Sequence, residues 1–458
     1  MRKAGFLWLL LVVILLTACA AEPKTEFQTE PVLTEKPINA GAFYASGKKA
    51  VEAANYLILD YDTEEVRTVG DSTFKKMVSG SASYQGYAQE GMLAKVEQTL
   101  DLGYYRCAYR EYYFENRAYA TVNDSYFWSN QSPEVFASRQ LPPVLLTPAL
   151  YDTIQYGEDL GTVLFSNPRN MEAWVGEGQL LEAFGQASLD EEGRLLRTTY
   201  HVKYRRGETD YSLTATVGIS APEKLDLSEI QSNAVQSSVW LSDLNTPQRL
   251  IQVVADVYSA QSLTCELRET IKSEAIPLSY IRNNRISFRG RESSLSAEVL
   301  NTSILSNNRG VITESRQTEQ FQEGIYTVSV NGGAASPDDG ITAISMRQYC
   351  EDTILSGLLA VKYLRGASAE ADGKLLRLEL DGDLVFREIM TRHLKDVLQV
   401  DLDALADVTQ HHDSGGYLTL DTETGLPVEF GMFMEKSHII DGITYKLDYR
   451  MDETLNFS

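Results

Sequence analysis

The 458-residue chain is short of basic residues, of histidine and of cysteine. It has 41 lysines and arginines against 64 aspartates and glutamates, which gives a formal net charge of −23. So acidic a chain repels phosphate backbones, and we therefore expect no nucleic-acid partner. Hydrophobic residues nevertheless make up 43% of the chain, enough to build a buried core, so wholesale disorder is excluded.

The sequence also lacks the common catalytic motifs. It has no Gly-x-Ser-x-Gly elbow, no HExxH zinc motif and no GxxxxGK[ST] or GxGxxG phosphate loop. His411-His412-Asp413 is the one cluster with metal-ligand chemistry, but neighbouring residues of a strand point to opposite faces, so a solvated loop is favoured over a metal site. Asp401 and Asp403 lack the glycine and glutamate spacing of an EF-hand. We expect no enzyme activity, no catalytic residue, no bound metal and no cofactor.

One long apolar run stands at the N-terminus. Arg2 and Lys3 precede the unbroken apolar run Phe6–Leu16. A membrane-spanning helix needs about 20 apolar residues, so this shorter run is typical of a secretory signal peptide. The run ends in Leu16-Thr17-Ala18-Cys19, which resembles the lipobox of bacterial lipoproteins. In those proteins the cysteine carries diacylglycerol and becomes the first residue of the mature chain.

The resemblance implies an extracytoplasmic protein anchored to the cell membrane by a lipid. Residues 1–18 are then the signal peptide, and residues 19–42 are the lipidated Cys19 and a flexible tether. Pro23, Pro31 and Pro37 lie among threonine, glutamate and lysine in this tether, a composition that does not bury a core.

The three other cysteines are Cys107, Cys265 and Cys350. An extracytoplasmic location permits disulfides. Three thiols cannot all pair within one chain, and Cys265 with Cys350 is the best candidate pair. Three free, buried thiols are at least as consistent with the sequence.

An internal repeat organises the rest of the chain. Residues 113–123 and 320–331 both run from an aromatic residue through a polar turn to a tyrosine and an alternating strand. Residues 188–195 and 419–426 both carry Leu-Asp, a polar turn with glycine and a resumed strand. The recurrence predicts two tandem domains. Their boundaries are 43–222 and 246–458, joined by the polar linker 223–245, part of which we expect to pack on a domain or to form a short helix.

Three segments have the spacing of amphipathic helices. The first domain is expected to open with a helix that places Val51, Ala54 and Ile58 on one face. The second is expected to open with a helix capped by Thr246, with Pro247 in its first turn. Its apolar face comprises Leu250, Val253, Val254 and Val257. A third apolar stripe comprises Phe386, Ile389, Met390, His393, Val397 and Leu398. His393 on this stripe is interpreted as a satisfied core histidine rather than a ligand.

Two C-terminal segments alternate as strands do. Apolar positions recur at every second residue in Leu426, Val428, Phe430, Met432 and Met434, and again in Ile443, Tyr445, Leu447 and Tyr449. Such period-two alternation indicates an antiparallel sheet with one apolar and one solvated face.

The segment before and within this hairpin resembles the LolA/LolB-like lipoprotein superfamily. It reads Gly416-Tyr417-Leu418-Thr419-Leu420-Asp421, then Gly425-Leu426-Pro427-Val428 after three residues. The first repeat keeps Leu189, Asp190, Gly193 and Leu195 but lacks the proline. The resemblance implies an α+β fold of two tandem half-open antiparallel β-barrels, each with helices on its concave side. In that superfamily the concave face is apolar and in several members holds lipid or the acyl chains of another lipoprotein.

These patterns lead to one functional hypothesis and one alternative. We expect binding of a hydrophobic ligand or of lipidated cargo, with a ligand cavity lined by five residues of the last two strands: Phe430, Met432, Met434, Tyr445 and Leu447. Ordinary core packing also explains the same residues. The alternative is a non-enzymatic sensor or scaffold that binds an envelope protein partner.

Overall fold

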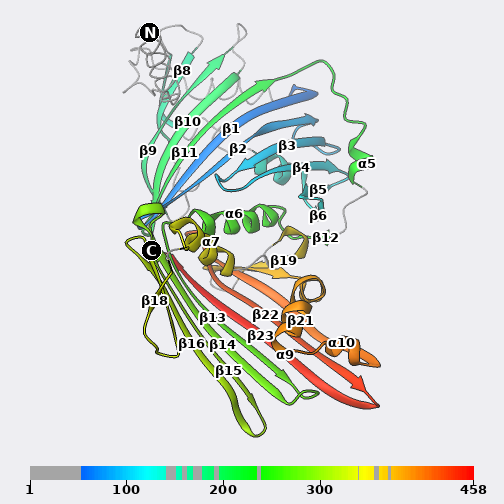
Figure 1. Cartoon of the computed structure of the whole chain (residues 1–458). Coiled ribbons are helices and arrows are strands. Elements are labelled where there is room, and N and C mark those ends of the chain that lie inside the picture. Colours follow the sequence, from blue (N-terminus) through cyan, green and yellow to red (C-terminus); the bar gives the residue numbers. More distant parts are fainter. Residues whose placement is uncertain are drawn as a thin grey trace, which may run out of the picture.

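The computed structural model describes residues 53–140, 151–156, 162–168, 178–189, 195–234, 239–338, 340–354, 360–369 and 373–457. Residues 1–52 lie outside this part of the chain, and with them lie the signal peptide, the lipobox, Cys19 and the tether. The described chain is mostly β-sheet with few helices (Figure 1). Its strands form two large sheets that diverge from a common junction.

The first sheet has twelve strands in the order β12-β6-β5-β4-β3-β2-β1-β11-β10-β9-β8-β7. All its pairs are antiparallel except β12 with β6. The strands are β1 (Tyr56–Val69), β2 (Ser72–Gln85), β3 (Leu93–Asp101), β4 (Arg106–Phe114), β5 (Arg117–Val122), β6 (Ser125–Asn130), β7 (Tyr151–Tyr156), β8 (Thr162–Pro168), β9 (Gln179–Leu189), β10 (Leu195–Arg206), β11 (Thr209–Ser220) and β12 (Val239–Trp240).

The second sheet has eleven strands in the order β18-β17-β16-β15-β14-β13-β23-β22-β21-β20-β19. The strands are β13 (Ser262–Ser273), β14 (Leu278–Arg289), β15 (Ser296–Asn307), β16 (Gly310–Gln322), β17 (Ile325–Val330), β18 (Ser336–Pro337), β19 (Leu364–Ala369), β20 (Leu375–Leu380), β21 (Val408–Asp421), β22 (Pro427–Ile440) and β23 (Ile443–Phe457).

Once β12 is set aside, the two sheets share one strand order. In each sheet the first strand pairs with the last, β1 with β11 and β13 with β23. The repeated hairpins at 113–123 and 320–331 are β4–β5 and β16–β17, which occupy equivalent places in the two orders. The segments 188–195 and 419–426 likewise fall at β9–β10 and β21–β22, although residues 190–194 lie outside the described chain. Neither sheet closes into a barrel through its described strands, so the tandem half-barrels stay a prediction.

The helices are short. They are α3 (Pro133–Gln140), α5 (Ile230–Ala234), α6 (Thr246–Ser259), α7 (Ala343–Thr353), α8 (Gly382–Val385), the π-helix η5 (Phe386–Met390), α9 (Thr391–Leu398) and α10 (Leu402–Leu405), with 3₁₀ turns η3 (Glu292–Ser294) and η4 (Val361–Tyr363). Within the described ranges, no helix combines the length and the apolar character that a membrane crossing requires.

The structure corrects one predicted helix and refines another. Ile58 lies on a strand rather than on a helix, because β1 begins at Tyr56. Leu57 and Leu59, the neighbours of Ile58, are both buried, which is the alternation of a strand. The helix predicted from Leu250 onward is α6, but its N-cap is Asn245 and Thr246 is already helical.

The predicted stripe from Phe386 to Leu398 is also helical. It spans η5 and α9 and buries Phe386, Met390, Leu394 and Leu398.

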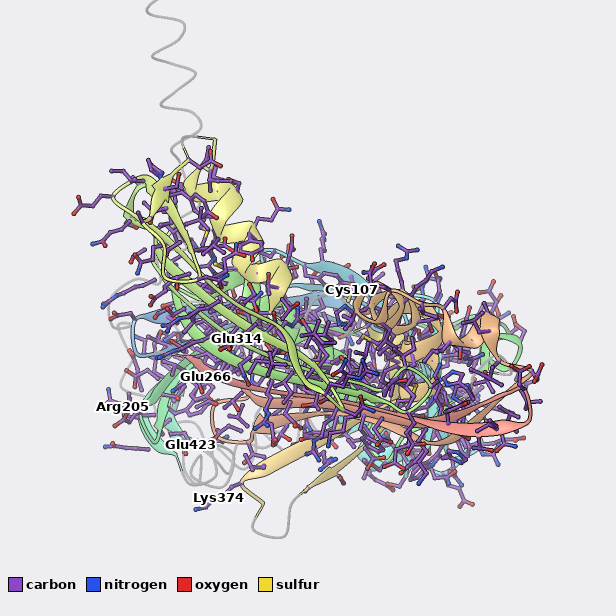
Figure 2. All side chains as sticks on the ribbon, turned by 60° about the horizontal axis from the view of Figure 1, so that its bottom comes forward. Cys107, Arg205, Glu266, Glu314, Lys374 and Glu423 are labelled. Atoms are coloured by element: carbon purple, nitrogen blue, oxygen red, sulfur yellow. The ribbon has the colours of Figure 1, made fainter. Side chains whose placement is uncertain are left out.

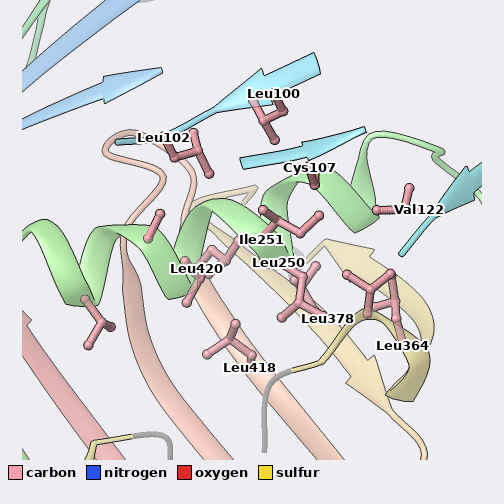
Figure 3. Close-up of a cluster of buried hydrophobic side chains, with 14 of the residues drawn as sticks. Leu100, Leu102, Cys107, Val122, Leu250, Ile251, Leu364, Leu378, Leu418 and Leu420 are labelled. Atoms are coloured by element: carbon pink, nitrogen blue, oxygen red, sulfur yellow. The ribbon is translucent and has the colours of Figure 1, made fainter. Parts of the chain in front are cut away.

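Helix α6 lies between the two sheets (Figure 3). Its Leu250 and Ile251 are buried among leucines of both sheets and belong to one continuous apolar core. Residues on the side of the first sheet are Leu100, Leu102, Cys107 and Val122, and residues on the side of the second are Leu364, Leu378, Leu418 and Leu420. The two halves of the chain therefore share a core through this helix.

Arg67 of β1 joins the sheets beside α6. Its Nη2 donates to Asp256 Oδ2 of α6 at 2.5 Å, and its Nη1 donates to the Thr424 carbonyl of the β21–β22 turn at 2.5 Å. Tyr211 of β11 donates to the Glu423 carbonyl of the same turn. Figure 2 labels Glu423 of this turn close to Arg205 of β10. The β21–β22 turn of the second sheet is thus held by β1 and β11, two neighbouring central strands of the first sheet.

The structure also describes most of the predicted linker and the three cysteines outside the signal region. In the predicted linker, α5 forms, Leu227 and Ile230 are buried with Tyr112 of β4, and β12 pairs with β6, so these described parts of the linker pack on the first sheet. Cys107, Cys265 and Cys350 are all buried, free thiols, so the candidate pair does not form a disulfide.

Arg67→Met tests the buried junction. It leaves the Asp256 carboxyl buried without its cation, and breaking such a pair costs about 3 kcal/mol of unfolding free energy. Urea denaturation of the variant and of the unmodified chain measures the difference.

Arg289→Met is the matched control. Arg289 also pairs across the sheets, with Asp71 at 2.7 Å, but both side chains are exposed. Exposed pairs contribute little, so this variant should unfold close to the unmodified chain. An equal loss in both variants would contradict a special role for the buried pair.

Candidate functional site

A cavity of about 830 Å³ lies where the inner face of the first sheet meets α6 and the β20–β21 edge of the second. Strands β1, β2, β3, β4 and β11 and helix α3 contribute one wall, and α6 with β19, β20 and β21 contributes the other. This volume lies within the range of small-molecule binding sites, about 300 to 1,000 Å³. The geometry is set by strand alternation, because Tyr61, Thr63, Glu65 and Arg67 follow one another at every second position of β1.

Much of the lining is apolar. Seven apolar side chains come from six different strands, so the wall is built by both sheets together: Tyr61, Phe74, Val78, Leu213, Ala369, Leu376 and Leu420. Hydrophobic and aromatic walls with a few placed polar groups are typical of ligand sites.

One polar cluster of the lining comes from α3 and β4. Arg139 Nη2 donates to Glu111 Oε2, and these side chains are only 8% and 2% exposed. Burial opposes the charge of Arg139, but neighbouring Glu111 raises its pKa above the ordinary value. Arg139 Nε and Nη1 have no hydrogen-bond partner among the described residues. Two of the three guanidinium nitrogens are therefore not satisfied by the described protein groups.

A second polar cluster comes from β1 and α6. Burial raises the pKa of Asp256, while Arg67 and the hydrogen bond from Gln252 act in the opposite direction. Gln252 Nε2 donates to Asp256 Oδ1 at 2.7 Å, and its buried Oε1 has no partner in the described chain. Arg67 Nε is likewise buried without an acceptor there.

The strand register shows that these clusters lie far apart. Glu111 pairs with Val96, Val96 with Ala82, and Ala82 with Leu59. Glu111 therefore stands level with Leu59, which precedes Arg67 by eight positions on β1. At about 3.3 Å per residue, the separation along the strands is about 26 Å. The cavity accordingly suits an elongated ligand.

The five residues predicted to bind ligand lie elsewhere. Phe430, Met432, Met434 and Leu447 are buried on β22 and β23, and Tyr445 is half-buried. None of the five lines the large cavity. Leu447 borders a space of about 20 Å³ under α9 and α10, which is close to the room one water occupies. Ligand binding by these residues stays a prediction.

Helix α10 is fixed over these strands by Asp403. Its carboxylate accepts hydrogen bonds from Lys436 Nζ at 2.9 Å and from His438 Nε2 at 2.8 Å, and both partners are buried on β22. The hydrogen bond from His438, then that from Lys436, holds the pKa of Asp403 well below its usual range. Asp403 thus forms ion pairs that join α10 to β22.

His393 is satisfied, as expected, but at the border of the core. Its Nε2 lies 2.5 Å from Oε1 of Glu269, a fully buried carboxylate on β13, while the His393 side chain is 31% exposed. Burial disfavours the charge on Glu269, but His393 and Arg282 keep its pKa below the ordinary value.

The His411-His412 pair lies on β21 rather than in a loop. His412 Nε2 pairs with Ser437 Oγ at 2.7 Å. In the part of the chain that the structure describes, no group of three histidine, cysteine or acidic side chains is arranged to hold a metal ion.

Sequence reasoning missed the charged residues of the cavity. Glu65, Arg67 and Lys76 occupy inward positions of β1 and β2, where alternation calls for apolar side chains. That departure from period two was the available signal. Asp256, the partner of Arg67 and 189 residues further along the chain, carried no such signal.

Comparison with known proteins assigns the chain to no family. No family model matches it, and no curated protein matches it in sequence. Among solved structures it is similar to LprF from Mycobacterium bovis, at 12% identity and a TM-score of 0.27, over 42% of this chain and 97% of LprF. It is also similar to a DUF1329 family protein from Desulfovibrio piger, at 10% identity and a TM-score of 0.16, over 46% of this chain and 92% of that protein. Likenesses this low establish neither fold nor function.

Asp403→Asn tests the attachment of α10. The depressed pKa means that the carboxylate stabilises the fold above its ordinary pKa of about 3.9 and that this stabilisation is lost as pH falls through the lower, folded value. The variant should therefore have a lower unfolding free energy than the unmodified chain at pH 7. This difference in unfolding free energy should become smaller below about pH 4. Urea unfolding at pH 7 and at pH 3 measures it.

Asp413→Asn, on the exposed face of β21, is the control, and its unfolding free energy should be close to that of the unmodified chain at both pH values. A difference for Asp403→Asn that is constant across this pH range would contradict the ion-pair role.

Proposed function

We propose that this protein is an extracytoplasmic lipoprotein, attached to the membrane by diacylglycerol on Cys19, that binds a hydrophobic ligand or lipidated cargo between its two sheets. The observation that carries the proposal is the 830 Å³ cavity, lined by apolar side chains of both sheets and by a few buried polar groups. Fold alone does not fix function, so the proposal rests on this site.

The charge of the chain is consistent with lipid attachment. A net charge of −23 is repelled by anionic head groups, so the folded part gains nothing from the membrane surface itself. Attachment would then depend on the acyl chains of Cys19, and two acyl chains suffice for stable anchoring. The tether, residues 19–42, would hold the two sheets clear of the surface.

The shared strand order supports a tandem repeat of LolA-like half-barrels as the finer description of the fold. The hairpin on which the resemblance rests has a physical basis. Asp421 Oδ1 accepts hydrogen bonds from the backbone nitrogens of Glu423 at 2.9 Å and of Thr424 at 2.7 Å. Gly425 has φ +70°, a conformation that glycine adopts without strain. The motif therefore encodes a tight turn, and in this chain the turn binds Arg67.

Filling the cavity tests ligand binding. The mature chain with Cys19→Ser, made without residues 1–18, should bind the neutral apolar probe N-phenyl-1-naphthylamine and a fluorescent fatty acid. Val78→Trp combined with Leu213→Trp places two indoles in the lining and should lower the affinity for both probes by about tenfold or more, as expected when apolar contacts of this size are lost. Fluorescence titration measures the affinity, and native mass spectrometry detects co-purified lipid.

Leu196→Trp is the matched control, because Leu196 is exposed on β10 and does not line the cavity. Its affinity should equal that of the starting chain. If that chain takes up neither probe and carries no lipid, the ligand-binding proposal is wrong. The alternative, a scaffold for a protein partner, would then be favoured by the exposed apolar side chains of β16 and β17, namely Val311, Ile312, Ile325 and Val330.

Cys19→Ser in the full chain tests the anchor. The thioether to diacylglycerol needs the cysteine thiol, so cells fed a radiolabelled fatty acid should label the unmodified protein and not the variant. Cys107→Ser, which removes a buried thiol, should leave the label unchanged. Equal labelling of the Cys19→Ser variant would refute lipidation at this position.

A further inference from the structure

The cavity differs in charge from the rest of the protein. Five basic and three acidic residues line it, whereas the chain as a whole carries −23. Two of the three acidic residues are already engaged, Glu111 by Arg139 and Asp421 by the backbone of its own turn. Four of the five basic residues also form ion pairs: Arg67 with Asp256, Lys75 with Glu64, Arg139 with Glu111 and Arg249 with Asp243. In the described chain, Lys76 is the basic residue of the lining that no ion pair engages.

Two of the basic residues are neighbours on the inner face of the first sheet. In the β1–β2 register, Glu65 pairs with Lys76 and Arg67 pairs with Phe74. Lys76 and Arg67 are therefore diagonal neighbours, a relation that places Cα atoms about 7 to 8 Å apart on one face. Two long cationic side chains at that spacing can reach one small anion between them.

The contacts of these two residues differ. Arg67 is fixed, with Nη1 and Nη2 on Thr424 and Asp256 and its Cζ 4.7 Å from the centre of the Phe74 ring. Lys76 is half-buried, and its ammonium has no ion pair or hydrogen bond within the described ranges. Glu65 stands directly opposite Lys76 but forms no ion pair with it there. Lys76 is therefore the cation with capacity left for a ligand.

From this geometry we propose that the ligand is an amphiphile with one anionic group, a carboxylate or a phosphate, which Lys76 binds beside Arg67. Its apolar part lies along Val78, Leu213 and Tyr61, in the direction of the Glu111–Arg139 cluster. This inference rests on the proposed function and names the chemical class of its ligand. A charge-assisted hydrogen bond from the Lys76 ammonium, inside a cavity that excludes part of the water, would favour an anionic amphiphile over a neutral one.

Displacement of N-phenyl-1-naphthylamine from the mature Cys19→Ser chain tests the proposal. The competitors are dodecanoate, dodecyl phosphate and dodecanol, which share one tail and differ in the head group. Both anions should displace the probe at concentrations about tenfold or more below that of dodecanol, because a charge-assisted hydrogen bond is worth at least that factor. The stronger of the two anions identifies the source as carboxylate or phosphate.

Two variants locate the anion. Lys76→Met keeps the length and apolar stem of the side chain and should abolish the advantage of both anions while leaving dodecanol unchanged. Glu65→Gln removes the opposing negative charge and should strengthen binding of the anions alone. Lys203→Met is the control, since Lys203 lies on β10, pairs with exposed Glu182 at 2.7 Å and does not line the cavity.

Each outcome decides the proposal. Suppose that dodecanol and the two anions displace the probe equally well, while the starting chain binds the probe and the Val78→Trp, Leu213→Trp variant binds it more weakly. This result overturns the anion site and leaves the proposed function standing. An effect of Lys76→Met no larger than that of Lys203→Met also overturns it. A chain that binds no probe and no competitor overturns both the inference and the proposed function.

Discussion

Burial of α6 between the two sheets is the constraint on which the rest of the structure depends. The helix presents Leu250 and Ile251 to leucines of both halves, so neither sheet completes its apolar core alone. A polar residue on such a helix must be satisfied inside the protein, and Asp256 is satisfied by Arg67 of the first sheet and by Gln252 of its own helix. Because Arg67 also binds the Thr424 carbonyl, one side chain fixes the helix, the first sheet and the β21–β22 turn in a single arrangement.

The cavity follows from the same arrangement. The two sheets diverge from the junction, and α6 occupies the space between them next to the junction (Figure 1). Beyond it, the alternate positions of β1 and β2 face β20 and β21 across the cavity. Charged residues at those positions are tolerable because they meet a partly solvated space rather than a packed interior.

Much of the fold could be predicted from local patterns, whereas the cavity could not. Period-two alternation is enough to place β22 and β23, and the spacing of Leu250, Val253 and Val257 is enough to place α6, because these signals lie within one element. The Val51–Ile58 pattern misled because three apolar residues fit a helix and a strand nearly equally well, and β pairing with β2 and β11 decided the outcome. The Arg67–Asp256 contact joins positions 189 residues apart, and no local pattern in one sequence encodes such a pairing.

Some residues that join the two sheets also line the cavity, so ligand binding in the cavity is coupled to the docking of the sheets. Arg67 belongs to both, and Gly425 and Asp421 of the turn that it binds line the same space. A ligand that contacts these groups binds only where the turn, the helix and β1 are already together. By linkage, such a ligand stabilises the docked sheets by the free energy of its own binding. The cavity is therefore best understood as part of the interface between the sheets, and loss of that interface would remove the site as well as the shared core.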